Sequence, residues 1–176
     1  INAGSLTSTS DNLTLSGANV EVAGNIDIDT GNLVIESLQD ESSSSSKTEG
    51  YNASVSKDGD VSGGANQNSS NSDSKWVKNQ TTLIGGTGGE GDVNITADST
   101  TITGATVASA TRNEDGSLTD NSSSGTGSLN LATDELVINN LQDKDHSESE
   151  GFNVSGSSGS TTVGLTSNGH KTEQDT

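Results

Sequence analysis

The sequence predicts an all-β fold, and three observations support this prediction. Apolar and polar residues alternate with period two in short segments, the pattern of strands with one buried face. The 22 glycines and the many Ser, Thr and Asn residues favour tight turns between such segments. No segment shows the 3.6-residue apolar period of an amphipathic helix. Short strands with tight connections are therefore expected throughout.

The composition limits the kind of core that these strands can form. Only 25% of the 176 residues are apolar, and the three aromatic residues are Tyr51, Trp76 and Phe152, so a thick globular core is not expected. A net charge of −18 combined with low hydrophobicity is typical of disordered chains, and disorder is the alternative that the strand pattern argues against. The acidity also disfavours nucleic acids and anionic membranes as partners, because it repels phosphate groups.

The first strands recur at a regular spacing. Triplets with apolar first and third residues begin at positions 13, 20, 26 and 33, and the first and fourth triplets, LTL and LVI, start 20 positions apart. That distance is the length of one rung in a three-sided parallel β-helix. Leu13 is then expected beneath Leu33, and Leu15 beneath Ile35. Such a solenoid needs only about six inward side chains per rung, because neighbouring rungs cover one another. The side chains expected to face water are Thr14, Glu21, Asp27 and Asp29.

A long internal repeat delimits the organisation of the chain. The segment LVIESLQD, residues 33–40, returns as LVINNLQD, residues 136–143. The second copy carries 16 additional polar residues, 111–126, which are expected to form an external loop. After LQD, both copies change to a charged, Ser-rich stretch followed by an aromatic-Asn pair. The sequence around Lys57-Asp-Gly-Asp60 is a turn signal, and it predicts a long hairpin that leaves the rungs.

This organisation gives four expected parts. They are rungs over 1–40, an arm over 41–75, rungs over 76–143 with the loop 111–126, and a second, truncated arm over 144–176. The chain begins at Ile1 without Met, and we expect a piece of a longer polypeptide whose second arm returns just beyond Thr176. The longest apolar runs are three residues, so neither a membrane span nor a signal-peptide core is expected. The absence of Cys excludes disulfides and thiolate metal sites.

The repeated segment is expected to mark the same junction twice, where a rung ends and an arm leaves. Leu33 and Ile35, like their counterparts in the second copy, should point inward. Leu38 and Leu141 should close the corner as buried anchors, so that Leu38→Asp costs about 2–4 kcal/mol. The remaining side chains assigned here are Leu136 and Ile138 facing inward, Val34 and Val137 on the outer wall, and Gln39 and Gln142 bonding to backbone groups.

Two further motifs accompany the tandem LQD segments and arms. The motifs are W-V-x-x-Q-T-x-L (Trp76, Val77, Gln80, Thr81, Leu83) and T-x-I-x-G-A-x-V (Thr100, Ile102, Gly104, Ala105, Val107). In this order the elements resemble the haemagglutinin repeats of two-partner-secretion exoproteins. These are the filamentous-haemagglutinin-type adhesins and the contact-dependent growth inhibition toxins.

The resemblance implies a right-handed β-helical filament at the surface of a Gram-negative bacterium or secreted from it. It implies export through a dedicated β-barrel partner in the outer membrane. In the toxin members, a repeat region of this kind is associated with passing a toxin into a target cell. The surface of that cell, or a receptor on it, is then a further partner. The function expected for this chain is therefore a structural and interaction module of an adhesin or a toxin-delivery filament.

No chemical motif supports an enzyme, a cofactor or a metal site. The Gly-rich bend GGTGGEGD, residues 85–92, places its Asp one position too early for a calcium-binding turn. His146 and His170 lie in different polar stretches, which favours solvated side chains over zinc ligands. Asp27 and Asp29 would stand on one outer face as surface charge, although acidic grooves on β-helices do serve polysaccharide enzymes.

Two alternatives to a structural module follow from these residues. A carbohydrate-binding or carbohydrate-active β-helix requires acidic residues on one face near an aromatic platform. An ice-binding solenoid requires Thr-x-Thr rows, but Thr101 and Thr103 do not recur rung after rung.

Two aromatic residues are the candidates for contact with a partner. Packing at the base of the hairpin is the favoured role of Tyr51 and Trp76, and a partner-binding surface is the alternative.

Overall fold

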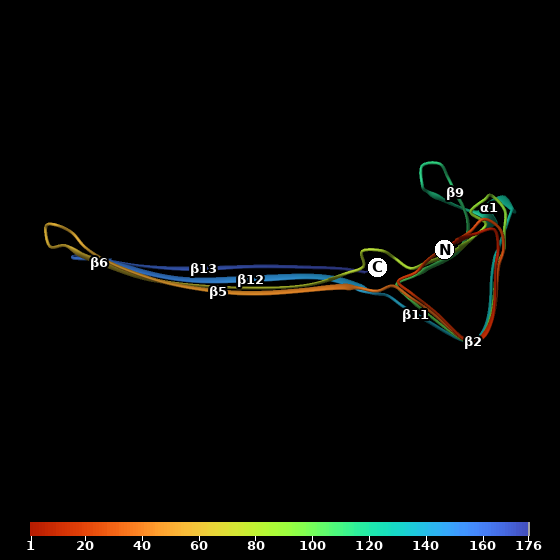
Figure 1. The fold of residues 1–176 in the computed structure, drawn as a ribbon, viewed down its shortest axis with the longest axis horizontal. Helices are drawn as coiled ribbons and strands as arrows, with labels where there is room; N and C mark the ends of the chain where they lie inside the picture. Colours follow the sequence, from red (N-terminus) through yellow and green to blue (C-terminus); the bar gives the residue numbers. More distant parts are fainter. Residues whose placement is uncertain (176) are drawn as a thin grey trace. The chain divides into compact units, whose positions relative to one another are not determined.

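The computed structural model describes residues 1–175 and consists of strands apart from one short helix (Figure 1). The all-β prediction is therefore confirmed for the described residues. The chain divides into two compact units. The first, which we call the parallel-sheet unit, comprises Ile1–Gln39 and Val77–Leu141. The second, the hairpin unit, comprises Asp40–Trp76 and Gln142–Asp175. The predicted second arm ends at Thr176, which lies outside the described residues.

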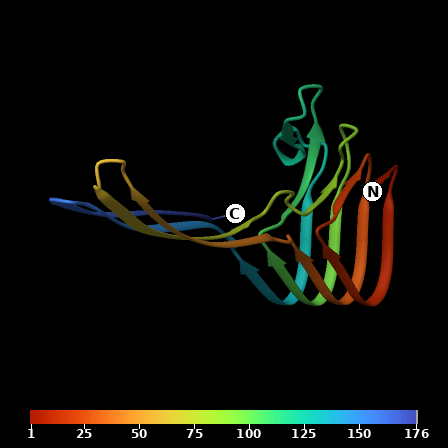
Figure 2. The same cartoon turned by 60° about the vertical axis from the view of Figure 1, so that its left-hand side comes forward.

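Four long strands form the larger sheet of the parallel-sheet unit. They are β2 (Leu6–Ser16), β4 (Ile26–Glu36), β8 (Val93–Thr103) and β11 (Leu129–Asn139), and they lie side by side in the order β11-β8-β4-β2 (Figure 2). All three pairings are parallel. Leu13 pairs with Leu33, and Leu15 pairs with Ile35, as the 20-residue spacing predicts.

Each long strand turns a corner near its middle. In β4 the buried positions are Ile26, Ile28 and Thr30 before the corner, and Leu33 and Ile35 after it. The inward side chains thus change from even to odd positions at Gly31. A Cβ at this glycine would lie 2.7 Å from the Asp11 carbonyl oxygen, so the close stacking of the corners requires glycine here. The sequence predicted two strands, 26–28 and 33–35, and the structure joins them into one bent strand.

A second sheet contains short strands. They are β1 (Asn2–Ala3), β3 (Asn19–Val22), β7 (Thr82–Gly85), β9 (Thr106–Arg112) and β10 (Leu118–Asp120), in the order β1-β3-β7-β9-β10. The first four are parallel, and β10 is antiparallel to β9. We use the word rung for each pair of one long and one short strand that follow each other in the chain, such as β2 and β3. The inner residues of both sheets form one apolar cluster, whose largest buried members are Val20, Val22, Ile26, Leu33, Ile35, Leu83 and Val93.

The polar insertion at 111–126 is more ordered than the predicted external loop. Its first two residues, Thr111 and Arg112, end β9 and pair antiparallel with β10, and helix α1 (Asn121–Ser124) follows directly. Asp120 caps this helix, accepting hydrogen bonds from the Ser122 hydroxyl at 2.7 Å and the Ser122 N–H at 2.9 Å. These bonds hold the pKa of the Asp120 carboxyl below its usual value. The helix ends at Gly125, whose φ of 70° allows the left-handed cap.

The hairpin unit is one antiparallel sheet of four strands with the order β13-β12-β6-β5. The strands β5 (Asp40–Val55), β6 (Val61–Trp76), β12 (Gln142–Ser157) and β13 (Ser160–Asp175) each contain 16 residues. The turn between β5 and β6 is the one predicted at residues 57–60, and Gly59 supplies its positive φ of 87°. The hairpins β5/β6 and β12/β13 pair with each other through β6 and β12.

Candidate functional site

The first junction, where the hairpin β5/β6 interrupts a rung, is held by two buried hydroxyl groups. Ser37 ends the rung before the hairpin, and Thr81 resumes it afterwards; both are buried. The Thr81 N–H donates to Ser37 Oγ at 2.8 Å. The hydroxyl groups therefore join the two ends of the insertion, although 44 positions separate them in the chain.

The same two hydroxyls also bond to the neighbouring rungs. Ser37 Oγ donates to the Gly104 carbonyl of the next rung at 2.6 Å, whereas Thr81 Oγ1 donates to the Glu36 carbonyl of its own rung at 2.7 Å. Thr81 Oγ1 in turn accepts from the Ala18 N–H at 3.2 Å. Backbone groups that would lose partners where the hairpin leaves are thus satisfied by side chains, which is the usual requirement for buried polar groups. We call this pair the junction latch.

The repeated leucines of the LQD segments occupy equivalent places. Leu38 lies over Gly17, where an added Cβ would be 3.0 Å from Leu38 Cδ1, and Leu141 lies over Gly104, where it would be 2.9 Å from Leu141 Cδ1. Both glycines have positive φ, 58° and 54°. The environments are shared, as the repeat predicted. However, Leu38 is 57% exposed, so it is not the predicted buried anchor. The predicted 2–4 kcal/mol cost of Leu38→Asp is therefore too large, because little burial is lost.

Leu33 and Ile35 point inward as predicted, but their counterparts in the second copy differ in burial. Leu136 pairs with Thr100, and Thr100 pairs with Leu33. The two leucines therefore lie in one column, by which we mean a line of paired residues that runs across the strands of the sheet. Leu33 is 1% exposed, whereas Leu136 is 47% exposed. The reason is position in the sheet: β11 is the end strand, and no further strand among the described residues stacks on it.

A second buried polar cluster fixes the insertion to the parallel-sheet unit. Asn121 is buried, and its amide donates to the Gly86 carbonyl and to Ser109 Oγ, both at 3.2 Å. Thr111 Oγ1 donates to Asn121 Oδ1 at 2.5 Å. On the surface nearby, Arg112 Nε donates to Glu21 Oε2 at 2.9 Å. Glu21, expected to face water, is thus half-buried in an ion pair with the insertion.

The Gly-rich bend, residues 85–92, packs against the preceding rung. A Cβ at Gly91 would lie 2.5 Å from the Gly24 carbonyl oxygen, so the backbones approach too closely for a side chain. Asp92 Oδ1 accepts hydrogen bonds from Ser128 N and Oγ at 2.9 and 2.8 Å. Its carboxylate therefore bonds to the next rung. Among the described residues, no group of three or more His, Asp or Glu side chains could hold a metal ion.

The other polar candidates lie on the surface. Asp11, Asp29 and Asp98 line a shallow pocket at the corner of β2, β4 and β8. The remaining lining residues are Thr9, Ser10, Thr30 and Gly31, and none is aromatic. The pocket therefore lacks the aromatic platform that a carbohydrate site requires. His146 and His170 are exposed, and they occupy different strands and different rows of the hairpin sheet.

The aromatic residues are carried by the hairpin unit, and its register places Tyr51 and Phe152 on the same face. Tyr51 pairs with Ala65, which pairs with Val154, while Phe152 lies two residues before Val154. The large apolar members of this face define an apolar patch: Tyr51, Val55, Val61, Phe152, Val163 and Leu165, all exposed. Directly behind this patch, the opposite face of the sheet carries Ser, Thr, Asn and Gly.

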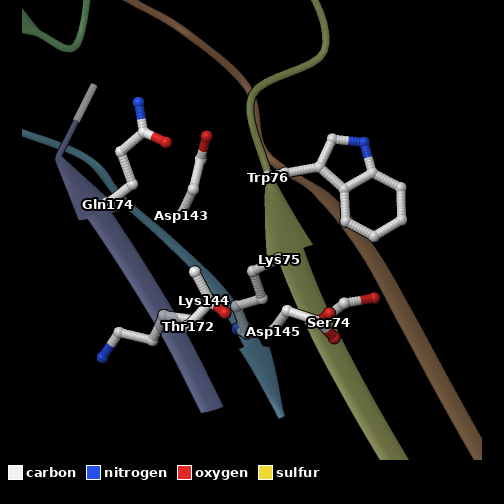
Figure 3. Close-up of a pocket in the computed structure, with 8 residues that line it drawn as sticks. All are labelled: Ser74, Lys75, Trp76, Asp143, Lys144, Asp145, Thr172 and Gln174. Atoms are coloured by element: carbon white, nitrogen blue, oxygen red, sulfur yellow. The ribbon is translucent and has the colours of Figure 1, made fainter. Parts of the chain in front are cut away.

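The two candidates for partner contact lie at different ends of the hairpin. Tyr51 is 81% exposed and sits toward the turn, so the interpretation of packing at the hairpin base is wrong for this residue. Trp76 lies at the base, at the end of β6 opposite Asp40, and is 41% exposed. Figure 3 shows it beside a shallow pocket. The pocket is lined by Ser74, Lys75, Trp76, Asp143, Lys144, Asp145, Thr172 and Gln174.

Near the base of the hairpin unit, one row across the four strands has two lysines at its centre and a glutamate at each end. Lys75 and Lys144 are opposite each other in β6 and β12, and the row continues with Glu41 and Glu173 at its two ends. Lys75 forms an ion pair with Glu41 at 2.5 Å. The pKa of Glu173 is lowered by a hydrogen bond and ion pair with Lys171. All are solvent-exposed, so their contribution to stability is small.

The comparison with protein families bears on the segment that contains the first junction. The family model described as hemagglutinin repeat matches residues 1–51. Residues 1–51 are a haemagglutinin-repeat region. This match indicates a segment of a filamentous haemagglutinin-type exoprotein, a structural class found in secreted or cell-surface proteins. No curated protein and no solved structure matches the chain. Within its described part, no helix has the length and hydropathy of a membrane span.

The junction latch was not predicted from the sequence. Ser37 lies inside the repeated segment but is Asn140 in the second copy, so the repeat itself gives no sign of its role. Thr81 was noted only as part of a family motif. Asn121, within the polar insertion, likewise resembled a solvated residue. In each case the signal is three-dimensional, because the partners come from different rungs.

Proposed function

We propose that this chain is a rung block of a right-handed parallel β-helix within a secreted exoprotein, with no chemistry of its own. The observation that carries the proposal is the first junction. A hairpin of two 16-residue strands is inserted into a rung, yet the rung register continues on both sides. Val20 pairs with Leu83 and Leu83 with Val107, so successive rungs stack across the insertion. Such an arrangement supports a scaffold that presents hairpins.

The match over residues 1–51 supports the biological setting of this scaffold. We place the protein outside a Gram-negative bacterium, exported through the outer-membrane transporter of a two-partner system. Its role is adhesion or contact-dependent toxin delivery, and its partner is the surface or a receptor of a target cell. The exposed Tyr51 and Trp76 are the residues proposed to contact that partner.

The coil of rungs can be tested with engineered disulfides, since the chain has no Cys. Thr7 pairs with Asp27, and both side chains are exposed. Neighbouring parallel strands lie about 4.8 Å apart, which is within the Cα range of a disulfide. The double variant Thr7→Cys/Asp27→Cys should therefore cross-link under mild oxidation, giving a faster-migrating species on non-reducing gels.

The matched control moves one cysteine by two residues on the same face. In Thr7→Cys/Asp29→Cys the two Cα atoms are about 8 Å apart, beyond disulfide reach. This variant should stay reduced under the same conditions. Equal cross-linking of the two variants, or no cross-linking of Thr7→Cys/Asp27→Cys, would contradict the pairing of residues 20 positions apart.

The proposed export and surface location are tested on cells that produce the full-length protein. Antibodies raised against the 176-residue chain should label intact cells, and external protease should remove the label without lysis. Deletion of the partner transporter should abolish surface labelling while the protein remains detectable in lysed cells. Labelling that requires permeabilised cells would contradict the proposal. Binding of the purified chain to a glycan array, reduced by Asp29→Asn, would instead favour the carbohydrate-binding alternative.

A further inference from the structure

The two hairpins of the chain already show how one hairpin recognises another. Strand β6, the second strand of the first hairpin, pairs with β12, the first strand of the second hairpin, continuously from Lys75–Lys144 to Ser62–Ser157. The pairing is antiparallel and extends over nearly the full strand length. Hairpins separated by a complete rung in the sequence are thus built to join edge to edge.

The hairpins leave the chain at a regular interval. The first hairpin follows β4 and the second follows β11, while β8, between them, is followed directly by β9 through a tight turn at Gly104. Hairpins therefore leave from every second rung.

Both outer edges of the hairpin sheet are open among the described residues, since β5 and β13 are its terminal strands. The Ser56 N–H donates to the backbone carbonyl of Asp60 across the first turn at 2.8 Å, and the Ser158 N–H donates to the backbone carbonyl of Val61 at 3.2 Å. Because hydrogen bonding alternates along antiparallel strands, these bonds turn the backbone groups of odd-numbered residues outward in both β5 and β13. Tyr51 and Val163 are two of them.

These edges lack proline and bulges, two of the features that usually prevent edge pairing, although Lys47 and Glu49 in β5 and Lys171 and Glu173 in β13 are charged. The chain contains no Pro, and both edge strands pair with their neighbours without a bulge over 16 residues. In β13 the first ten residues, 160–169, carry no charge. Natural edge strands are normally short, bulged, or protected by Pro and Lys.

We propose that the outer edge of β13 binds the outer edge of β5 from a second copy of this chain. The contact repeats the one seen between β6 and β12: the second strand of one hairpin meets the first strand of the next, antiparallel. The sheet thereby extends from copy to copy in a head-to-tail manner that does not close.

The side chains fit the register that continues the rows of the sheet. In this register Val163 lies opposite Tyr51, and Thr166 opposite Thr48. Aromatic–β-branched and Thr–Thr pairs are favourable cross-strand pairs. The one like-charged pair is Glu41 with Glu173, and each of these carboxylates already forms an ion pair with a Lys of its own sheet. The apolar patches of the two copies become continuous.

The test uses the 176-residue chain and two edge-blocking variants in sedimentation velocity at moderate salt, which screens the net charge of −18. The unaltered chain should show a mass that rises with concentration beyond a dimer. Val163→Pro blocks the β13 edge, and Tyr51→Pro blocks the β5 edge, while neither removes an N–H that points into the sheet. Each variant alone should sediment as a monomer. Mixed together, they should form a one-to-one dimer through the two unblocked edges.

The control Phe152→Thr removes the centre of the apolar patch without touching an edge. It should associate as the unaltered chain does. Loss of association in this variant, with association retained in Val163→Pro, would show face-to-face docking and overturn the proposal. A monomeric unaltered chain at its highest soluble concentration would also overturn it.

A second measurement covers the case in which a proline variant does not fold. In the unaltered chain, amide exchange at odd-numbered residues of β5 and β13 should slow by at least tenfold between dilute and concentrated samples. The inward amides, such as that of Thr162, should change little. Equal slowing at both sets, or at neither, contradicts edge pairing.

Discussion

Replacing Leu33 with Ala should lower the free energy of unfolding by about 2–5 kcal/mol, the range for a fully buried leucine. Leu33 is 1% exposed and belongs to the apolar cluster shared by both parallel sheets. This apolar cluster is small, so the neighbouring strands have few other apolar side chains with which to fill the cavity. Urea denaturation of the purified chain, followed by circular dichroism, measures the change.

The internal repeat supplies a control with the same side chain, followed by the same Val-Ile pair in the sequence. Leu136 is the counterpart of Leu33, but it is 47% exposed because β11 is the last strand of its sheet. The substitution Leu136→Ala should cost less than about 1 kcal/mol, since little apolar area returns to water. Equal losses of unfolding free energy for the two substitutions would mean that β11 is covered in solution. A negligible loss for Leu33→Ala would contradict the burial of Leu33 between its neighbouring strands.

The columns themselves could be predicted from the sequence, for a clear physical reason. Alternation of period two fixes which residues face inward, and the 20-residue interval fixes which of these stack. Leu13 with Leu33 and Leu15 with Ile35 follow from those two facts alone. The corner at Gly31 was less accessible, because a strand that bends without breaking its ladder has the same sequence pattern as two strands joined by a turn.

Side-chain burial at the ends of the sheet could not be predicted in this way. Leu136 and Leu33 have nearly identical sequence neighbours, and only the place of β11 in the strand order separates them. The same holds for the partners of Asn121, which come from segments 35 and 12 positions away. The pairing of the two hairpins was equally hidden, since Ser-rich strands carry little apolar pattern to specify a register.

Replacing Thr81 with Val should lower the free energy of unfolding by about 1–3 kcal/mol, the cost of leaving one backbone N–H without a partner. Valine has nearly the same shape but no hydroxyl, so the Ala18 N–H loses its 3.2 Å acceptor. The Glu36 carbonyl loses one of two donors and keeps the Gly17 N–H at 3.0 Å. Thr81 is fully buried, and water does not replace either bond. The expected result is a lower urea midpoint with an unchanged m-value.

Three further variants separate the junction latch from general polarity. Thr81→Ser keeps the hydroxyl and should recover most of the stability lost in Thr81→Val. Ser54→Ala removes an exposed hydroxyl that bonds only to Ser62 at the far end of the hairpin, and it should change stability by less than about 0.5 kcal/mol. Ser37→Ala combined with Thr81→Val should cost less than the sum of the single changes, because the two hydroxyls belong to one connected network. Strict additivity of the two would show that they act separately, and the rung would then be closed around the hairpin by its backbone ladder alone.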